Sequence, residues 1–140
     1  MEYKTRTLRI KVQLNDIVEI VPNKDWSEPD TLELARENVI AMKKAVDGKG
    51  RGLLSHTSNT YLSKEVLKCY SQAEIGEVAT AMLTTSFGSK IVGNLFLKLL
   101  GKSKMGEGKR GKAPIRIFDV KNKNEAIEWL LECIKKNKAL

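Results

Sequence analysis

The sequence contains few of the residues that mark disulfide, metal or catalytic sites. It has two cysteines, one histidine and three prolines in 140 residues, and aromatic residues make up 6%. Cys69 and Cys133 belong to no CxxC or Cys/His pattern, which argues against a zinc site. Both stand among apolar neighbours in helix-like segments, so we interpret them as small buried side chains. The sequence therefore predicts no metal centre and no cofactor.

Long apolar runs are absent too. No stretch approaches the ~20 residues that a spanning helix needs, and the first thirty residues alternate charged with apolar side chains. We therefore expect a cytoplasmic protein. A length of 140 residues with 41% hydrophobic and 30% charged side chains fits one globular domain, residues 1–140, and excludes an enzyme with separate cofactor and substrate lobes.

The positive charge of the chain is concentrated in one segment. Residues 88–116 contain eight basic residues and only one acidic residue, Glu107, a local balance of +7. The rest of the chain, with 17 bases and 16 acids, is nearly neutral. This concentration favours contact with an anionic partner. The expected contact residues are Lys98, Lys102, Lys104, Lys109, Arg110 and Lys112.

Hydrophobic periodicity predicts an α/β fold. Alternating or β-branched runs predict strands at residues 8–12, 17–21, 53–56, 78–83 and 114–118, the first two forming a hairpin. Apolar residues three and four apart predict helices at residues 31–46, 63–72, 89–100 and from 122 onward. The packing face expected for the helix at residues 89–100 consists of Ile91, Val92, Leu95, Phe96 and Leu99. Asp30, Ser63 and Asn122 are the expected N-caps, with Glu33 and Glu125 as capping-box partners. This order indicates a mixed, mostly parallel sheet opened by a β-hairpin and flanked by about four helices.

Residues 101–113 interrupt this pattern and are expected to form a flexible basic loop. The loop contains a near match to the nucleotide-binding pattern GxxxxGK, ending at Lys112. Ala113 stands where Ser or Thr would coordinate magnesium, and the segment precedes a strand instead of a helix. Nucleotide hydrolysis by this loop is therefore not expected.

Three segments carry a family resemblance: Gly93-Asn94-Leu95-Phe96, residues 114–118, and Glu125-Ala126-Ile127-Glu128-Trp129-Leu130. Together with the βαβ spacing they resemble small bacterial STAS-like proteins, related in fold to anti-sigma-factor antagonists and to the CRAL-TRIO lipid-transfer fold. The resemblance covers residues 8–131. It implies a STAS-like fold and a regulatory, self-associating or partner-binding role, for which a homodimer or a protein partner is expected.

Anti-sigma-factor antagonists carry a phosphorylated serine in an Asp-Ser-Ser-Gly segment at a helix start. Here Ser63-Lys64-Glu65-Val66 lies over that segment, so Glu65 replaces the phosphoacceptor and Val66 the glycine. Partner switching by phosphorylation of the usual kind is therefore not implied. Ser63 remains a hydroxyl at a helix N-terminus, where N-capping is its simpler role.

The only histidine, His56, follows a predicted strand at the edge where α/β sheets often bind ligands. Polar residues beside it, with Ser63, extend this to a possible pocket: Ser55, Thr57, Ser58 and Asn59. No nucleophile is paired with a base by spacing, so the chain is not expected to be an enzyme.

Three functions remain open. The first is a non-enzymatic regulatory or protein-interaction module. The second is binding of a lipid or other anionic amphiphile through the crevice and the basic loop, since lysines contribute about 1 kcal/mol each at an anionic membrane surface. The third is nonspecific nucleic-acid binding, which is less favoured because residues 101–113 contain no aromatic residue for base stacking.

Overall fold

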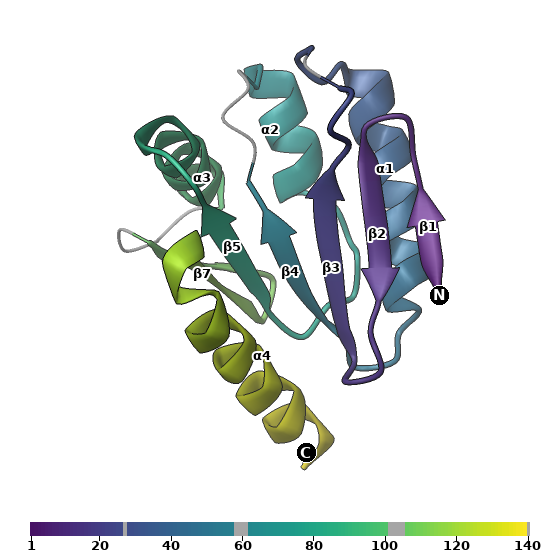
Figure 1. The fold of residues 1–140 in the computed structure, drawn as a ribbon, viewed down its shortest axis with the longest axis vertical. Helices are drawn as coiled ribbons and strands as arrows, with labels where there is room; N and C mark the ends of the chain where they lie inside the picture. Colours follow the sequence, from purple (N-terminus) through teal and green to yellow (C-terminus); the bar gives the residue numbers. More distant parts are fainter. Residues whose placement is uncertain (27, 58–61, 101–105, 140) are drawn as a thin grey trace.

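A seven-stranded mixed sheet forms the centre of the molecule (Figure 1). The computed structural model describes residues 1–26, 28–57, 62–100 and 106–139. The sheet order is β1-β2-β3-β4-β5-β7-β6, in which β3, β4, β5 and β7 run parallel and both edges are antiparallel. The strands are β1 (Glu2–Lys4), β2 (Leu8–Val12), β3 (Ile17–Pro22), β4 (Gly52–His56), β5 (Thr80–Thr84), β6 (Glu107–Arg110) and β7 (Ala113–Asp119). The predicted α/β class and the opening hairpin, here β2–β3, are confirmed.

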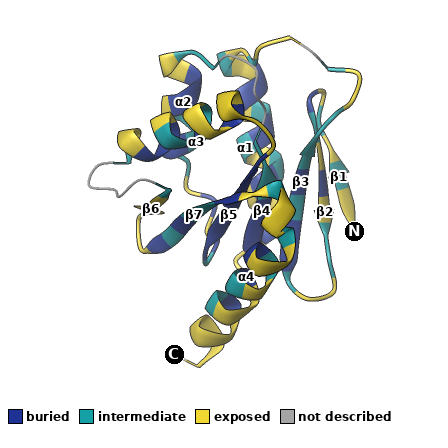
Figure 2. Cartoon of the chain, turned by 60° about the vertical axis from the view of Figure 1, so that its left-hand side comes forward, coloured by how far each residue is buried: buried dark blue, intermediate teal, exposed yellow. Residues whose placement is uncertain are grey.

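Four helices cover the two faces of the sheet unequally. They are α1 (Leu32–Val46), α2 (Lys64–Ser71), α3 (Phe87–Leu99) and α4 (Lys123–Lys138), the last preceded by a 3₁₀ turn, Val120–Asn122. The parallel strands succeed one another in one direction across the sheet, so right-handed crossovers place α1, α2 and α3 on the same face. Helix α4 follows the last strand and covers the opposite face (Figure 2).

The central strands are buried on both faces. Leu53 of β4 packs with Met42 and Val46 of α1, whereas its neighbour Leu54 packs with Leu130 of α4. This is the two-residue alternation of a strand between two helical layers. All five residues of β5 are buried, as its continuous apolar sequence predicts.

The helix starts agree with the sequence predictions in part. Ser63 accepts a hydrogen bond from the Val66 amide and caps α2, as predicted. Helix α1 is capped by Thr31 instead of Asp30, and α3 begins two residues earlier than predicted, with Ser86 and Ser89 forming a capping box. Asn122 makes no side-chain cap.

The apolar face predicted for α3 is corrected by the structure. Phe96 is buried, but Ile91, Leu95 and Leu99 are exposed to 45%, 45% and 38%. Helix α3 is therefore apolar on its outer side as well, because an apolar row on each side of the helix satisfies the same three- and four-residue spacing.

The expected irregular loop over residues 101–113 is wrong for its second half. Residues 101–105 lie outside the described residues, but β6 forms a hairpin with β7 in which Arg110 pairs with Ala113. Gly111, with φ +62°, occupies the first position of the two-residue turn, where a type II′ hairpin requires positive φ. Strand β1, which the sequence analysis did not predict, extends the other edge.

Candidate functional site

A cavity of about 150 Å³ lies between the sheet and the three helices α1, α2 and α3. Apolar side chains from both layers form most of its wall, namely Ile20, Met42, Leu53, Leu67, Met82 and Phe96. The wall also includes Pro22, His56 and Thr57, so the cavity reaches the carboxyl ends of β3 and β4. This is the sheet edge at which parallel α/β folds commonly bind ligands.

Polar groups on one side of this cavity form a hydrogen-bond chain. The Tyr70 hydroxyl donates to Asp30 Oδ2 at 2.7 Å and accepts from Asn38 Nδ2 at 2.9 Å. Asn38 is buried and is held in turn by Thr5 and Thr7. Burial raises the pKa of the Tyr70 phenol, and the nearby Asp30 carboxylate raises it further. The phenol therefore stays protonated and acts as a fixed hydrogen-bond donor.

A buried ion pair occupies another part of the wall. Arg110 of β6 binds Glu77 through two guanidinium nitrogens, with Nε 2.8 Å from Glu77 Oε2, and its Nη1 donates to the Tyr70 carbonyl at 2.7 Å. The two side chains are only 11% and 4% exposed. The guanidinium also lies 5.9 Å from the ring centroid of Phe96. The charge of Arg110 is thus matched within the fold, which differs from the solvated anion contact expected from the sequence.

Thr57 adds a hydroxyl group to the cavity wall. Its backbone amide donates to the Leu83 carbonyl at 2.8 Å and so continues the β4–β5 ladder, which fixes the residue beside the cavity. Its Oγ1 is buried and has no hydrogen-bond partner among the residues that the structure describes. An unpaired buried hydroxyl costs free energy, and a bound ligand would remove that cost.

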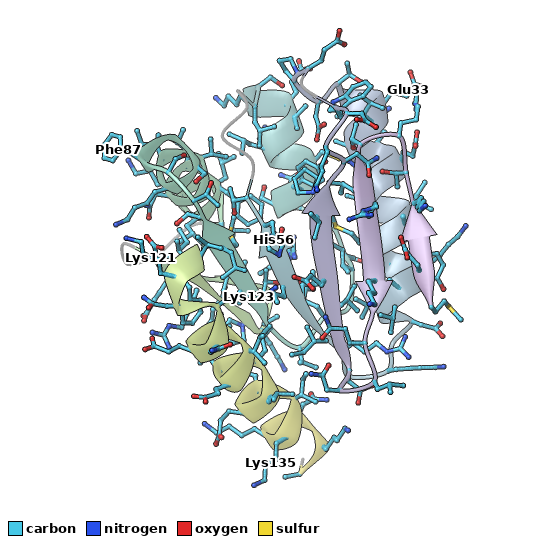
Figure 3. The ribbon with its side chains drawn as sticks, viewed as in Figure 1. Glu33, His56, Phe87, Lys121, Lys123 and Lys135 are labelled. Atoms are coloured by element: carbon cyan, nitrogen blue, oxygen red, sulfur yellow. The ribbon has the colours of Figure 1, made fainter. Side chains whose placement is uncertain are left out.

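His56 lies at the end of β4, where the sequence analysis expected a pocket, but its ring is engaged elsewhere. The ring Nε2 is 2.7 Å from Glu19 Oε2, and Lys123 Nζ of α4 donates to the same oxygen at 2.8 Å (Figure 3). Burial raises the pKa of Glu19, but the hydrogen bonds from Lys123 and His56 lower it more, so the net pKa lies below its ordinary value. This cluster joins β3, β4 and α4, and so has a structural role.

The other predicted site residues do not converge on the cavity. Ser63 Oγ is used as the cap of α2. Lys98 is exposed on α3, and Lys109 and Lys112 are exposed on β6 and its turn. Ser58, Asn59, Lys102 and Lys104 lie outside the described residues.

Sequence reasoning missed most of the groups that shape this site. Asp30 was assigned to a helix cap, and Tyr70 was given no binding role, whereas Thr57 was expected among the polar residues beside His56. Asp30, Asn38 and Tyr70 come from segments up to 40 residues apart, and no local pattern indicates that they meet.

In the described part of the chain, no three His, Cys, Asp or Glu side chains gather as metal ligands would. No helix there has the length and apolar character needed to cross a bilayer. Burial raises the pKa of Cys133, which disfavours its thiolate. No protein-family model, curated protein or solved structure significantly matches this chain.

Proposed function

We propose that this chain is a non-enzymatic regulatory module that binds a small, uncharged and mainly apolar molecule in the cavity between the sheet and α1, α2 and α3. The observation that carries the proposal is the cavity itself, about 150 Å³ with mostly apolar walls. The Thr57 hydroxyl beside it has no hydrogen-bond partner in the described ranges of the chain. A cavity of this size lined by Leu, Ile and Phe is large enough for a benzene-sized ligand. The ligand would therefore have about six to ten heavy atoms.

The charges around the cavity favour an uncharged ligand. Arg110 is paired with Glu77, and Asp30 accepts from the Tyr70 hydroxyl, so neither charge needs a ligand to balance it. A charged group placed against the apolar wall would lose its hydration without gaining a counter-ion. One hydroxyl or carbonyl group on the ligand would form a hydrogen bond with the Thr57 hydroxyl.

The polar side chains of the cavity wall do not suit catalysis. The Tyr70 phenol is protonated and engaged, and the His56 ring pairs with Glu19. A nucleophile needs a base that can deprotonate it; the Tyr70 hydroxyl lies within reach of Asp30, but its raised pKa keeps it protonated. Ligand uptake alone fits these groups.

The proposal is tested by NMR of the full chain with ¹³C-methyl methionine. Met42 and Met82 line the cavity, whereas Met1 is 81% exposed and serves as an internal control. Benzyl alcohol is the probe, toluene its counterpart without a hydroxyl, and benzoate its charged counterpart. We expect saturable shifts of Met42 and Met82 with benzyl alcohol and toluene, no shift of Met1, and no saturable shift with benzoate.

Two matched variants locate the binding. Val92→Phe places a larger side chain in the cavity wall and is expected to weaken benzyl alcohol binding roughly tenfold or more. Ile91→Phe makes a similar enlargement one residue away, on a side chain that is 45% exposed, and is expected to leave binding unchanged. Absence of saturable shifts, or equal affinities in the two variants, would overturn the proposal.

Self-association and a protein partner, which the STAS resemblance implies, remain predictions that a size-exclusion measurement can test. Nucleic-acid binding is not proposed. Part of the basic segment forms β6, and Arg110 is already neutralised by Glu77.

A further inference from the structure

The outer side of α3 carries an exposed row of apolar side chains. Phe87, Ile91, Leu95 and Leu99 are exposed to 78%, 45%, 45% and 38%, and we call this row the α3 ridge. Their four-residue spacing places them in one line along the helix. Phe87 lies at the outer end of α3 and points away from the sheet (Figure 3). Contiguous exposed apolar rows of this kind mark interaction surfaces.

Positive charge accompanies the ridge. Lys90 and Lys98 are exposed on the same helix and border the row, because each lies three residues after a ridge position. The sequence contains no aspartate or glutamate between Val78 and Gly106, so α3 carries no acidic side chain. Apolar side chains bordered by lysines suit a surface that offers hydrocarbon beneath anionic groups.

We infer that the α3 ridge docks on an anionic lipid bilayer, with Phe87 and Leu95 entering the acyl region and Lys90 and Lys98 meeting the head groups. The ridge side chains are exposed along the outer side of α3, where a flat bilayer surface can reach them. A second copy of the chain would bring the same lysines face to face, and this repulsion disfavours self-association through the ridge.

The ridge and the cavity use different sides of α3. Val92 and Phe96 line the cavity, whereas Ile91 and Leu95, one residue before each, are exposed. Membrane docking is therefore independent of the proposed function, and each can fail without the other.

The test is sedimentation of the full chain with phosphatidylcholine vesicles that contain 30% phosphatidylserine, compared with pure phosphatidylcholine vesicles. We expect binding to the anionic vesicles that weakens with added salt, and much weaker binding to the neutral ones. Phe87→Ser/Leu95→Ser and, separately, Lys90→Glu/Lys98→Glu are each expected to lower the partition coefficient roughly tenfold or more. These are surface substitutions, so thermal unfolding should verify that the variants remain folded.

Helix α1 provides matched controls. Ile40 is 57% exposed and Lys43 and Lys44 are also exposed, so Ile40→Ser and Lys43→Glu/Lys44→Glu alter the same residue types elsewhere. These variants are expected to bind anionic vesicles about as well as the unmodified chain. The inference is overturned if the unmodified chain does not bind anionic vesicles, or if the α1 variants lose as much binding as the α3 variants. Self-association that the α3 substitutions abolish, without vesicle binding, would also overturn it and make the ridge an interface between copies.

Discussion

Arg110 and Glu77, 33 residues apart in the sequence, form a buried ion pair that fastens the edge strand β6 to the segment before β5. Thr80 donates a further hydrogen bond to the same Glu77 oxygen at 3.3 Å. The pair therefore connects the last hairpin of the sheet with its centre. It also gives order to part of a segment that, from its sequence alone, is glycine-rich and strongly basic.

Removing one partner of this pair should strongly destabilise the fold. Arg110→Met leaves the Glu77 carboxylate buried without a counter-ion, and loss of one partner in a buried pair costs about 3–5 kcal/mol. We expect the free energy of unfolding in urea to fall by that amount.

The double variant Arg110→Met/Glu77→Leu removes both charges and should recover most of the loss, because apolar replacement of a whole buried pair is often neutral. If the double variant is as unstable as Arg110→Met, then the loss of stability comes mainly from the hydrogen bond that Arg110 donates to the Tyr70 carbonyl, and not from the unpaired charge of Glu77.

Gly93 allows α3 to approach β7 closely. A Cβ at this position would lie 3.0 Å from Ile117 Cδ1. Gly93→Ala is expected to reduce the free energy of unfolding by about 1–3 kcal/mol through overpacking. Ile117→Val deletes the atom in question, so the combined variant should be more stable than the sum of the single effects predicts. Strict additivity in a double-mutant cycle would contradict this explanation.

The sequence predicted those elements whose signal is local. The strand at residues 53–56, the apolar run of β5 and the Ser63 cap each depend on neighbouring residues, and each is confirmed. Strand β6 could not be predicted in this way. Its apolar content is low, and its place in the sheet depends on Glu77, which no local pattern links to Arg110.

The candidate site shows the same division. Its position at the carboxyl ends of the strands followed from strand order and from His56. Its composition did not, because the cavity combines side chains from three helices and five strands. Hydrophobic periodicity also did not predict which side of α3 is buried. The helix has two apolar rows with the same spacing, and only one of them is buried.

Glu19 gives the fold a pH-dependent contribution. Burial raises the pKa of its carboxyl, but hydrogen bonds from Lys123 and His56 lower it to a net value below 4.5. The contribution to stability is therefore complete above about pH 4.5 and is lost as the pH falls through the lower pKa of the folded state. We therefore expect Glu19→Gln to be less stable than the unmodified chain above about pH 4.5. The difference in their free energies of unfolding should become smaller as the pH is lowered below 4.5. Urea unfolding at several pH values measures this, with Glu65→Gln on the exposed side of α2 as the control.

The Tyr70 hydroxyl connects α2 with the start of α1, and its removal tests how the polar side of the cavity is held. Tyr70→Phe removes the phenol that donates to the half-buried Asp30, and it leaves the buried Asn38 Nδ2 with Thr7 Oγ1 but without its second acceptor. Each unsatisfied buried group costs about 1–3 kcal/mol, so a loss of that order or somewhat more is expected in urea unfolding. The ring itself is retained, so the apolar wall should still give saturable Met42 and Met82 shifts with toluene. Loss of toluene binding at unchanged stability would instead mean that the hydroxyl itself forms part of the binding site.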